Sequence, residues 1–327
     1  MKSYVGVDLG GTRTKLALAN ADGEVQRKAT IATQAEEGPS VVLQRIGDAI
    51  HDLACHTTDV VHGIGVGVPG LVDLETGSTK FLPNLSTHWR DVPVAETLRA
   101  RFDCDIRLLN DVRTATNGEL HYGHGRDRDR VTMAFLSIGT GIGGGLVIDG
   151  KLRLGPLGAA GEMGHQTLVP DGPRCGCGNH GCLEALASGP ALAAEGARLM
   201  RIGLAPSLHQ LVNGSAENVT PEKMSLAAPH DAPIADAITK AGDYLGIAMA
   251  NVVSTLHPDL IVIGGGVAQM GDRLLKPIRH AIQNRVRMFP TDSIQVLPSK
   301  LGDAAGVLGA VALAMHGDAT PNVGSKF

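Results

Sequence analysis

Two short apolar parts of the chain each stop at a group of glycines and then continue. The first stops at Gly10-Gly11, and the second stops within the glycine-rich stretch 139–145. The flanking apolar segments are Tyr4–Leu9 and Lys15–Ala19 around the first turn, and Thr132–Ile138 and Leu146–Ile148 around the second. Strands joined by tight glycine turns have this pattern. Because the pattern occurs once in each half, it indicates a weak internal duplication and predicts two similar domains facing each other.

The segments after the first hairpin predict crossover units. Val25–Thr33 can supply a third strand, and Ser40–Leu53 has apolar residues at helical spacing. Further strands are expected at Gly63–Val68, Ile106–Leu109 and Leu260–Ile263, and further helices at Pro93–Phe102, Ala232–Leu256 and Asp272–Met288. The polar stretch 203–233 is expected to form short elements, and the tail from Gly317 to be frayed. A hairpin sheet continued by crossover units indicates the α/β class.

Composition excludes several classes of protein. The 327 residues are 43% hydrophobic, which allows a folded core, and the net charge of -4 gives no general attraction to nucleic acid or anionic membranes. The uncharged stretch 131–148 contains five glycines, which fits a hairpin better than a membrane helix. The N-terminal residues lack a secretory signal, so we expect a cytoplasmic protein with no nucleic-acid or membrane partner.

The first glycine turn, within Asp8–Lys15, has the residues of a phosphate site. Glycines at a strand turn expose backbone N–H groups, and the Thr12 and Thr14 hydroxyls add donors. Asp8, at the end of the first strand, could hold Mg²⁺. A tight hairpin with a capping aspartate is the alternative for this motif alone. The second turn, which begins Gly139-Thr140-Gly141, favours a clamp on a polyphosphate.

Asp111 follows the predicted strand Ile106–Leu109 through Asn110, where a helix begins. It can be the N-cap of that helix, or a general base that accepts a proton from a substrate hydroxyl during phosphoryl transfer. The carboxyl ends of strands are where α/β sheets bind ligands.

Three cysteines lie within eight residues, and a histidine precedes them. His165, Cys175, Cys177 and Cys182 match a Cys₃His zinc site without an open position, which is typical of a structural metal. His180 is an alternative ligand that we expect outside the site. Unrelated reduced cysteines are the remaining interpretation.

These motifs together resemble the ROK family (repressors, open reading frames, kinases) of the sugar kinase, Hsp70 and actin superfamily. The resemblance covers residues 8 to about 309 and is carried by DLGGTRTK, SIGTGIGGG, GEMGH, CGCGNHGCLE and IVIGGGV. It implies an α/β fold of two actin-like ATPase (ribonuclease H-like) domains with an interdomain cleft. The expected domains are 1–118 with 303–327, and 119–302, which carries the zinc loop and nucleotide site.

The resemblance also implies a role for individual residues. Asp111 matches the catalytic base. The positions that match sugar-binding residues are Asn84, Asn110, Glu162, His165 and Glu184. The positions that match ATP-binding residues are Asp8, Gly10, Gly11, Thr12, Thr14, Lys15, Gly139, Thr140, Gly141, Gly264, Gly265 and Gly266. His165 is then expected to bind zinc through one ring nitrogen and a sugar hydroxyl through the other.

The activity implied is transfer of a phosphoryl group from Mg²⁺·ATP to the 6-hydroxyl of a hexose, with glucose as the first candidate. N-acetylmannosamine, N-acetylglucosamine, fructose, allose or another polyol are alternative acceptors, and polyphosphate is an alternative donor. A homodimer or homotetramer is expected from the resemblance alone. Rival classes are a non-catalytic sugar-binding regulator and a chaperone-type ATPase. Family repressors carry a DNA-binding segment before the phosphate motif, which here begins at Asp8.

The chain departs from the family pattern on the sugar side. Val112-Arg113-Thr114-Ala115-Thr116 replaces the usual small residues after the catalytic aspartate, and Leu109 replaces a frequent acidic residue. Ser86-Thr87-His88 lacks the usual Pro-Gly pair. These departures leave kinase activity as the expectation and bear on the identity of the sugar.

Overall fold

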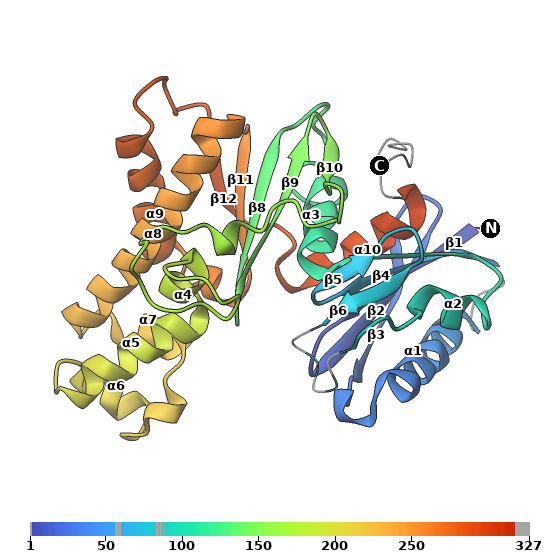
Figure 1. Cartoon of the computed structure of the whole chain (residues 1–327), viewed down its shortest axis with the longest axis horizontal. Coiled ribbons are helices and arrows are strands. Elements are labelled where there is room, and N and C mark those ends of the chain that lie inside the picture. The colour runs from blue at the N-terminus through green and yellow to red at the C-terminus, as the bar shows by residue number, and fades with distance from the viewer. Residues whose placement is uncertain (1, 56–59, 83–84, 86, 88, 318–327) are drawn as a thin grey trace. The chain divides into compact units, whose positions relative to one another are not determined.

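The computed structural model describes residues 2–55, 60–82, 85, 87 and 89–317 (Figure 1). The chain divides into two compact units. Unit 1 comprises residues 1–130, 145–161 and 300–327, and unit 2 comprises residues 131–144 and 162–299. The domain limits expected from the sequence remain a prediction, because compactness alone does not define independently folding domains.

Unit 1 is built on a five-stranded sheet with the order β3-β2-β1-β4-β7. The strands β1–β2 and β2–β3 pair antiparallel, whereas β1–β4 and β4–β7 pair parallel. The elements are β1 (Lys2–Leu9), β2 (Arg13–Asn20), β3 (Val25–Ala32), η1 (Ala35–Glu37), α1 (Pro39–Ala54), β4 (Val60–Val68), β5 (Leu71–Asp73), β6 (Ser78–Phe81), α2 (Val94–Arg99), β7 (Asp105–Asn110), α3 (Asp111–His121), β10 (Lys151–Arg153), η5 (Gly302–Ala304) and α10 (Ala305–His316). The hairpin followed by crossover strands confirms the α/β prediction.

The two faces of this sheet carry side chains of different size. Val5 and Val7 are completely buried in an apolar core with residues of α1 and α2. Gly6 and Gly65 point the other way, because neighbouring strand residues face opposite sides. A Cβ atom on either glycine would overlap backbone atoms of α10. The small residues therefore allow α10 to lie directly on the sheet.

Gly309 in α10 permits an equally close contact with α3. A Cβ atom there would overlap the Thr114 carbonyl oxygen and lie 2.8 Å from the Gly118 nitrogen. We expect Gly309→Ala to lower the free energy of unfolding by about 3 kcal/mol or more, because backbone atoms cannot move aside as side chains do. Calorimetric unfolding measures this loss. Gly196→Ala in α5 is the control, since the three atoms nearest to its new methyl group belong to the side chains of Met224 and Val219 and not to backbone. Equal melting temperatures for the two variants would contradict the prediction.

The second five-stranded sheet has the order β10-β9-β8-β11-β12, in which β8, β11 and β12 are parallel. Helices α8 and α9 of unit 2 pack side by side (Figure 1), at glycines 242 and 246. The elements are β8 (Met133–Ile138), β9 (Ile142–Ile148), η2 (Met163–His165), α4 (Leu183–Ala187), α5 (Gly189–Arg201), α6 (Pro206–Leu211), η3 (Ala216–Asn218), α7 (Pro221–Ala227), α8 (Ala232–Leu256), β11 (Leu260–Gly264), η4 (Gly266–Met270), α9 (Asp272–Arg285) and β12 (Gln295–Pro298).

The glycines 143–145 are strand residues, so the predicted turn over 139–145 is too long. Only residues 139–141 connect β8 to β9. A side chain on Gly145 would overlap Thr116 of α3, which shows that this glycine serves close packing and not a turn.

Most other boundaries agree with the sequence to within two residues, but β4 begins at Val60 and not at Gly63, and α2 ends at Arg99 and not at Phe102. Residues 203–233 form the expected short elements, whereas α9 ends at Arg285 and not at Met288. The tail expected to be frayed lies, from residue 318 onward, outside the described residues. Among the described helices, none combines the length and apolar character that crossing a membrane requires.

Candidate active site

In unit 1, the predicted site residues that the structure describes collect at one edge of the sheet. The parallel register pairs Asp8 with Gly67 and Gly67 with Leu109, so β1, β4 and β7 end at the same level. Asp8 and the Asn110-Asp111 pair therefore lie at the carboxyl edge, with β4 between their strands. Ligands bind at this edge in parallel α/β sheets.

The first glycine turn is held in shape by Thr33, which the sequence reasoning did not single out. The Thr33 hydroxyl donates to the Gly10 carbonyl at 2.7 Å, and its backbone N–H donates to the Thr12 carbonyl at 2.9 Å. Thr14 is completely buried, and its hydroxyl lies 3.0 Å from that of Thr33. The Thr14 side chain thus supports the turn from inside, which corrects the prediction that its hydroxyl is presented to a phosphate.

The remaining predicted residues of this turn are exposed or half-buried. Gly11 and Thr12 are exposed, and Gly10 is half-buried. The Lys15 ammonium group donates to the carbonyl of Asp303 at 2.9 Å, which connects β2 to the segment before α10.

Asp8 packs against the first turn of α10. A Cβ atom on Gly306 would lie 2.6 Å from Asp8 Oδ2, so a side chain there would force the carboxylate to move. Burial raises the pKa of Asp8, and the positive charge of Lys15 opposes that shift. A carboxylate at the N-terminal end of a helix also gains from the helix dipole. This arrangement keeps an acidic group at the sheet edge next to the glycine turn.

Asn110, and not Asp111, is the N-cap of α3. Its Oδ1 accepts from the backbone N–H groups of Val112 at 3.0 Å and Arg113 at 3.2 Å. The interpretation of Asp111 as an N-cap is therefore wrong. Asp111 is the first helical residue, is half-buried, and has Oδ1 2.8 Å from the Val112 nitrogen. Asn84, the other predicted sugar-binding asparagine, lies outside the described residues.

In unit 2, two predicted nucleotide turns lie together at the carboxyl ends of β8 and β11. The register pairs Gly264 with Ser137, so the two strands end side by side. Gly265 has a φ of 82°, and a Cβ atom on it would overlap Ile138 just before the turn 139–141. Thr140 and Gly266 are exposed. The structure thus brings these two glycine turns to one edge.

Glu184 connects the second glycine turn to the cysteine cluster. Its Oε2 accepts from the Ile142 N–H at 2.9 Å, and a Cβ atom on Gly141 would overlap the same oxygen. The other carboxylate oxygen, Oε1, lies 3.8 Å from the Cys175 sulfur. Glu184 is the second residue of α4, whose N-cap is Cys182. The carboxylate therefore fixes the turn relative to the cluster.

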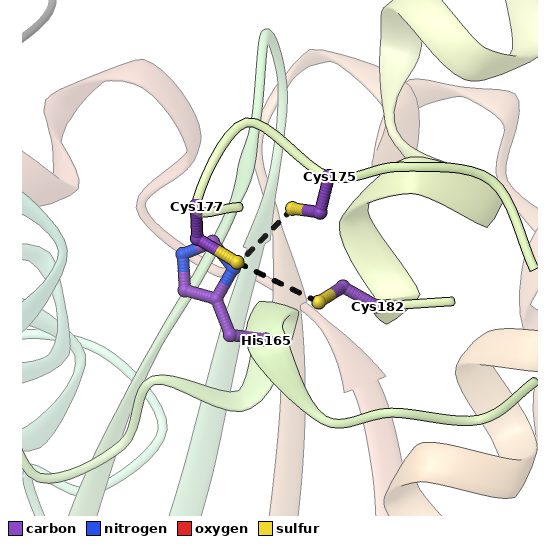
Figure 2. Close-up of side chains that lie close together, drawn as sticks. All are labelled: His165, Cys175, Cys177 and Cys182. Atoms are coloured by element: carbon purple, nitrogen blue, oxygen red, sulfur yellow. Dashed lines mark hydrogen bonds between the residues drawn. The ribbon is translucent and has the colours of Figure 1, made fainter. Parts of the chain in front are cut away.

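The four predicted metal ligands point toward one another (Figure 2). The Cys177 and Cys182 sulfurs are 3.7 Å apart, and His165 Nδ1 is 3.7 Å from the Cys175 sulfur. All four ligand atoms lie within 4.8 Å of one another. Two sulfurs bound at ~2.3 Å to one tetrahedral zinc ion would be about 3.8 Å apart. The donor set and its spacing therefore fit zinc.

The local backbone explains how the cysteines converge. Arg174 and His180 form a bridge that closes a small hairpin around Cys175 and Cys177. Gly181 then has a φ of 64°, and a Cβ atom there would overlap Val169. His180 is exposed, with Nδ1 3.3 Å from the Gly172 carbonyl, so it lies outside the cluster as expected.

The two ring nitrogens of His165 face different groups. Nδ1 faces the cluster, whereas Nε2 lies 3.9 Å from Glu162 Oε2. Both side chains are partly accessible, at 35% and 40% exposure. This geometry leaves Nε2 available for the second role predicted for His165.

A protein-family model described as ROK family matches residues 4–316. A glucokinase of Thermotoga maritima is 34% identical over 94% of this chain and 96% of its own. A xylose repressor of Caldicellulosiruptor bescii is 31% identical over 95% of this chain and 77% of its own. The crystal structure of a ROK family glucokinase from Streptomyces griseus, in complex with glucose and AMPPNP, superposes with a TM-score of 0.80 at 31% identity, covering 95% and 99% of the two chains.

Proposed function

The chain belongs to the ROK family and has the actin-like ATPase fold of its kinases, and on this basis we propose that it is an ATP-dependent sugar kinase that phosphorylates the 6-hydroxyl of a hexose. Glucose is the first candidate for the acceptor. The support is that relatives named glucokinase align with nearly the whole chain, and that one of them was crystallised with glucose and an ATP analogue.

The position of Asp111 is the observation that carries the proposal. It is a half-buried carboxylate that directly follows β7, at the sheet edge where Asp8 also lies. In the proposed reaction, the hydroxyl oxygen of the sugar attacks the γ-phosphorus of ATP, and Asp111 accepts the hydroxyl proton. The bond between the γ-phosphorus and the bridging oxygen breaks, which releases ADP.

The glycine turns supply the proposed contacts to the nucleotide. Backbone N–H groups of Gly10–Thr12 and Gly139–Gly141 would bind phosphate oxygens, and Gly264–Gly266 would lie beside the adenine. Asp8 would bind Mg²⁺ that arrives with ATP, directly or through water. Its raised pKa reflects burial, which a bound divalent cation would offset by stabilising the charged form.

The zinc ion proposed for the cluster would be structural. Cys175, Cys177, Cys182 and His165 fill four coordination positions, so no position is left for a substrate. The residues around the cluster would bind the sugar: Glu162, the Nε2 atom of His165, and Glu184, together with Asn110 and Asn84. Fixing the loop would fix His165, because it is itself a proposed ligand, and Glu184, because it lies beside Cys175.

Two substitutions at Glu184 separate its role in holding the glycine turn from its proposed role in binding the sugar. Glu184→Ala removes the acceptor of the Ile142 N–H, and we expect the KM for ATP and for the sugar each to rise about 10-fold or more, as for loss of a hydrogen bond to a charged group. Glu184→Gln keeps an oxygen for Ile142, so the KM for ATP is expected to stay within about twofold while the KM for the sugar rises. Steady-state kinetics with each substrate varied in turn measures both. Equal effects of the two variants on the KM for ATP would contradict a role for Glu184 in holding the turn.

The proposed activity is tested by ADP release from Mg²⁺·ATP with a panel of glucose, mannose, fructose, allose and N-acetylhexosamines, and with polyphosphate as a second donor. Turnover on one sugar supports the kinase and identifies the acceptor.

A sugar-binding regulator without turnover is the second candidate, because the xylose repressor aligns with 95% of this chain. Sugar binding by calorimetry without ADP release would favour it over the kinase.

A further inference from the structure

Arg113, in the first turn of α3, is a buried arginine with an unusual set of partners. Its side chain is 2% exposed. Nη1 donates to Asn110 Oδ1 at 3.0 Å, Nε donates to the Ala160 carbonyl at 3.2 Å, and Nη2 donates to the Ala159 carbonyl at 3.1 Å. One guanidinium group therefore joins the N-cap of α3 to a segment far along the chain.

Placing an arginine here is unfavourable without these partners. A positive charge near the N-terminus of a helix opposes the helix dipole. Burial removes water from the guanidinium group, so its N–H groups need acceptors from the protein. Lysine would not be equivalent, because a single ammonium group cannot reproduce the planar fork that reaches several acceptors at once. The geometry thus depends on arginine itself.

The contact with Asn110 is one of four hydrogen bonds that set which way its side-chain amide faces. Oδ1 accepts from Val112 N–H, Arg113 N–H and Arg113 Nη1, and Nδ2 donates to the Gly70 carbonyl at 3.0 Å. The oxygen is therefore occupied by three donors, and the amide keeps one further N–H to offer. The cap bonds, the Gly70 carbonyl and Arg113 together hold the Asn110 oxygen toward the protein, so an N–H is the group that this amide can offer to a ligand.

The carbonyls of Ala159 and Ala160 belong to a glycine-rich loop, Leu154–Gly161. Gly155, Gly158 and Gly161 all have positive φ, at 72°, 67° and 94°. A bond from the Ala160 N–H to the Leu154 carbonyl closes the loop at 2.8 Å. The next residue along the chain is Glu162, which the proposed function assigns to the sugar. Arg113 therefore anchors the backbone directly before a proposed sugar-binding residue.

We propose that Arg113 is a positioning residue of the sugar site, which fixes the Asn110 amide and the loop Leu154–Gly161 together. This inference rests on the proposed function for the identity of the ligand. The family pattern has small residues at position 113, so this chain departs from it there. The inference gives that departure a consequence: the sugar side of this site depends on one guanidinium group, and the nucleotide side does not.

The test compares Arg113→Lys and Arg113→Met with the native protein. We expect the KM for the sugar to rise about 10-fold or more in both variants, because hydrogen bonds to a charged group are lost. The KM for ATP is expected to stay within about twofold. Hydrogen–deuterium exchange of the loop Leu154–Gly161 should become faster in both variants, which is a readout that needs no turnover. Arg279→Lys is the matched control, since Arg279 also binds a backbone carbonyl, that of Val296, with two nitrogens.

The outcomes separate this inference from the proposed function. If the native protein phosphorylates a sugar but the Arg113 variants change both KM values equally, or change neither, the inference is overturned. Unchanged exchange of the loop also overturns it. If the native protein phosphorylates no sugar, the proposed function fails, and sugar-binding calorimetry together with the exchange rates still decides whether Arg113 positions the site.

Discussion

Asp111→Asn is expected to lower kcat for sugar phosphorylation by at least ~10²-fold while the protein stays folded. Asparagine has nearly the same shape, and its oxygen can still lie beside the Val112 N–H, as Asp111 Oδ1 does at 2.8 Å. It cannot accept the proton that the sugar hydroxyl must lose. Loss of one negative charge in the first turn of α3 is expected to cost at most about 1 kcal/mol of stability.

Kinetics and calorimetry together check this prediction. The variant should bind the sugar and ATP with affinities close to the native values, while ADP release nearly stops. Asp236→Asn, at an exposed aspartate of α8, is the control for the same chemical change and should keep full activity. A kcat within about threefold of the native value would rule out Asp111 as the base, since a positioned base contributes ~10²-fold or more.

Loss of one cluster cysteine is the second change that is expected to have a large effect, on both zinc content and stability. Cys182→Ser should reduce bound zinc from one ion per chain to nearly none, because the Cys182 sulfur is completely buried beside that of Cys177. Structural zinc contributes directly to folding free energy, with apparent values of about 10–16 kcal/mol in small zinc peptides. We therefore expect the melting temperature to fall by several degrees and the region 165–184 to become sensitive to protease. Activity should fall with it, since Glu184 and His165 lose their anchors.

Elemental analysis, thermal unfolding and limited proteolysis measure these effects. Cys55→Ser is the matched control, because Cys55 is exposed and lies outside the cluster, and it should keep both zinc and activity. His180→Ala should also keep zinc. A Cys182→Ser protein that retains one zinc ion per chain, or a native protein that is stable and free of zinc, would refute the Cys₃His assignment.

Sequence patterns identified those parts of the fold and site that depend on neighbouring residues. The hairpin at Gly10-Gly11 and the parallel strands were predicted from apolar runs and glycines, because a buried strand needs an apolar run and a tight turn needs glycine. The cysteine cluster was predicted from spacing, because its three thiols come from one short loop. The family resemblance, which the comparisons confirm, added the expected roles of Glu162 and Glu184.

Such local patterns could not predict contacts between segments that are distant in the sequence. Gly145 looked like part of a turn, but it is a strand residue that makes room for Thr116. Thr14 looked like a phosphate donor, but its hydroxyl lies against that of Thr33, the residue that follows β3. Asp111 looked like a possible cap, but Asn110 has that role.

The succession of residue types along short stretches of the chain determined which residues could form strands, turns and a metal site. Each of these needs only residue type and spacing over a few positions. Tertiary structure fixed what those residues contact. Arg113 shows the difference: in the sequence it is only a departure from a run of small residues, whereas in the fold it meets carbonyls of residues 159 and 160. A buried charge takes its partners from whichever backbone the fold brings near, and that choice is made by the packing of the whole unit.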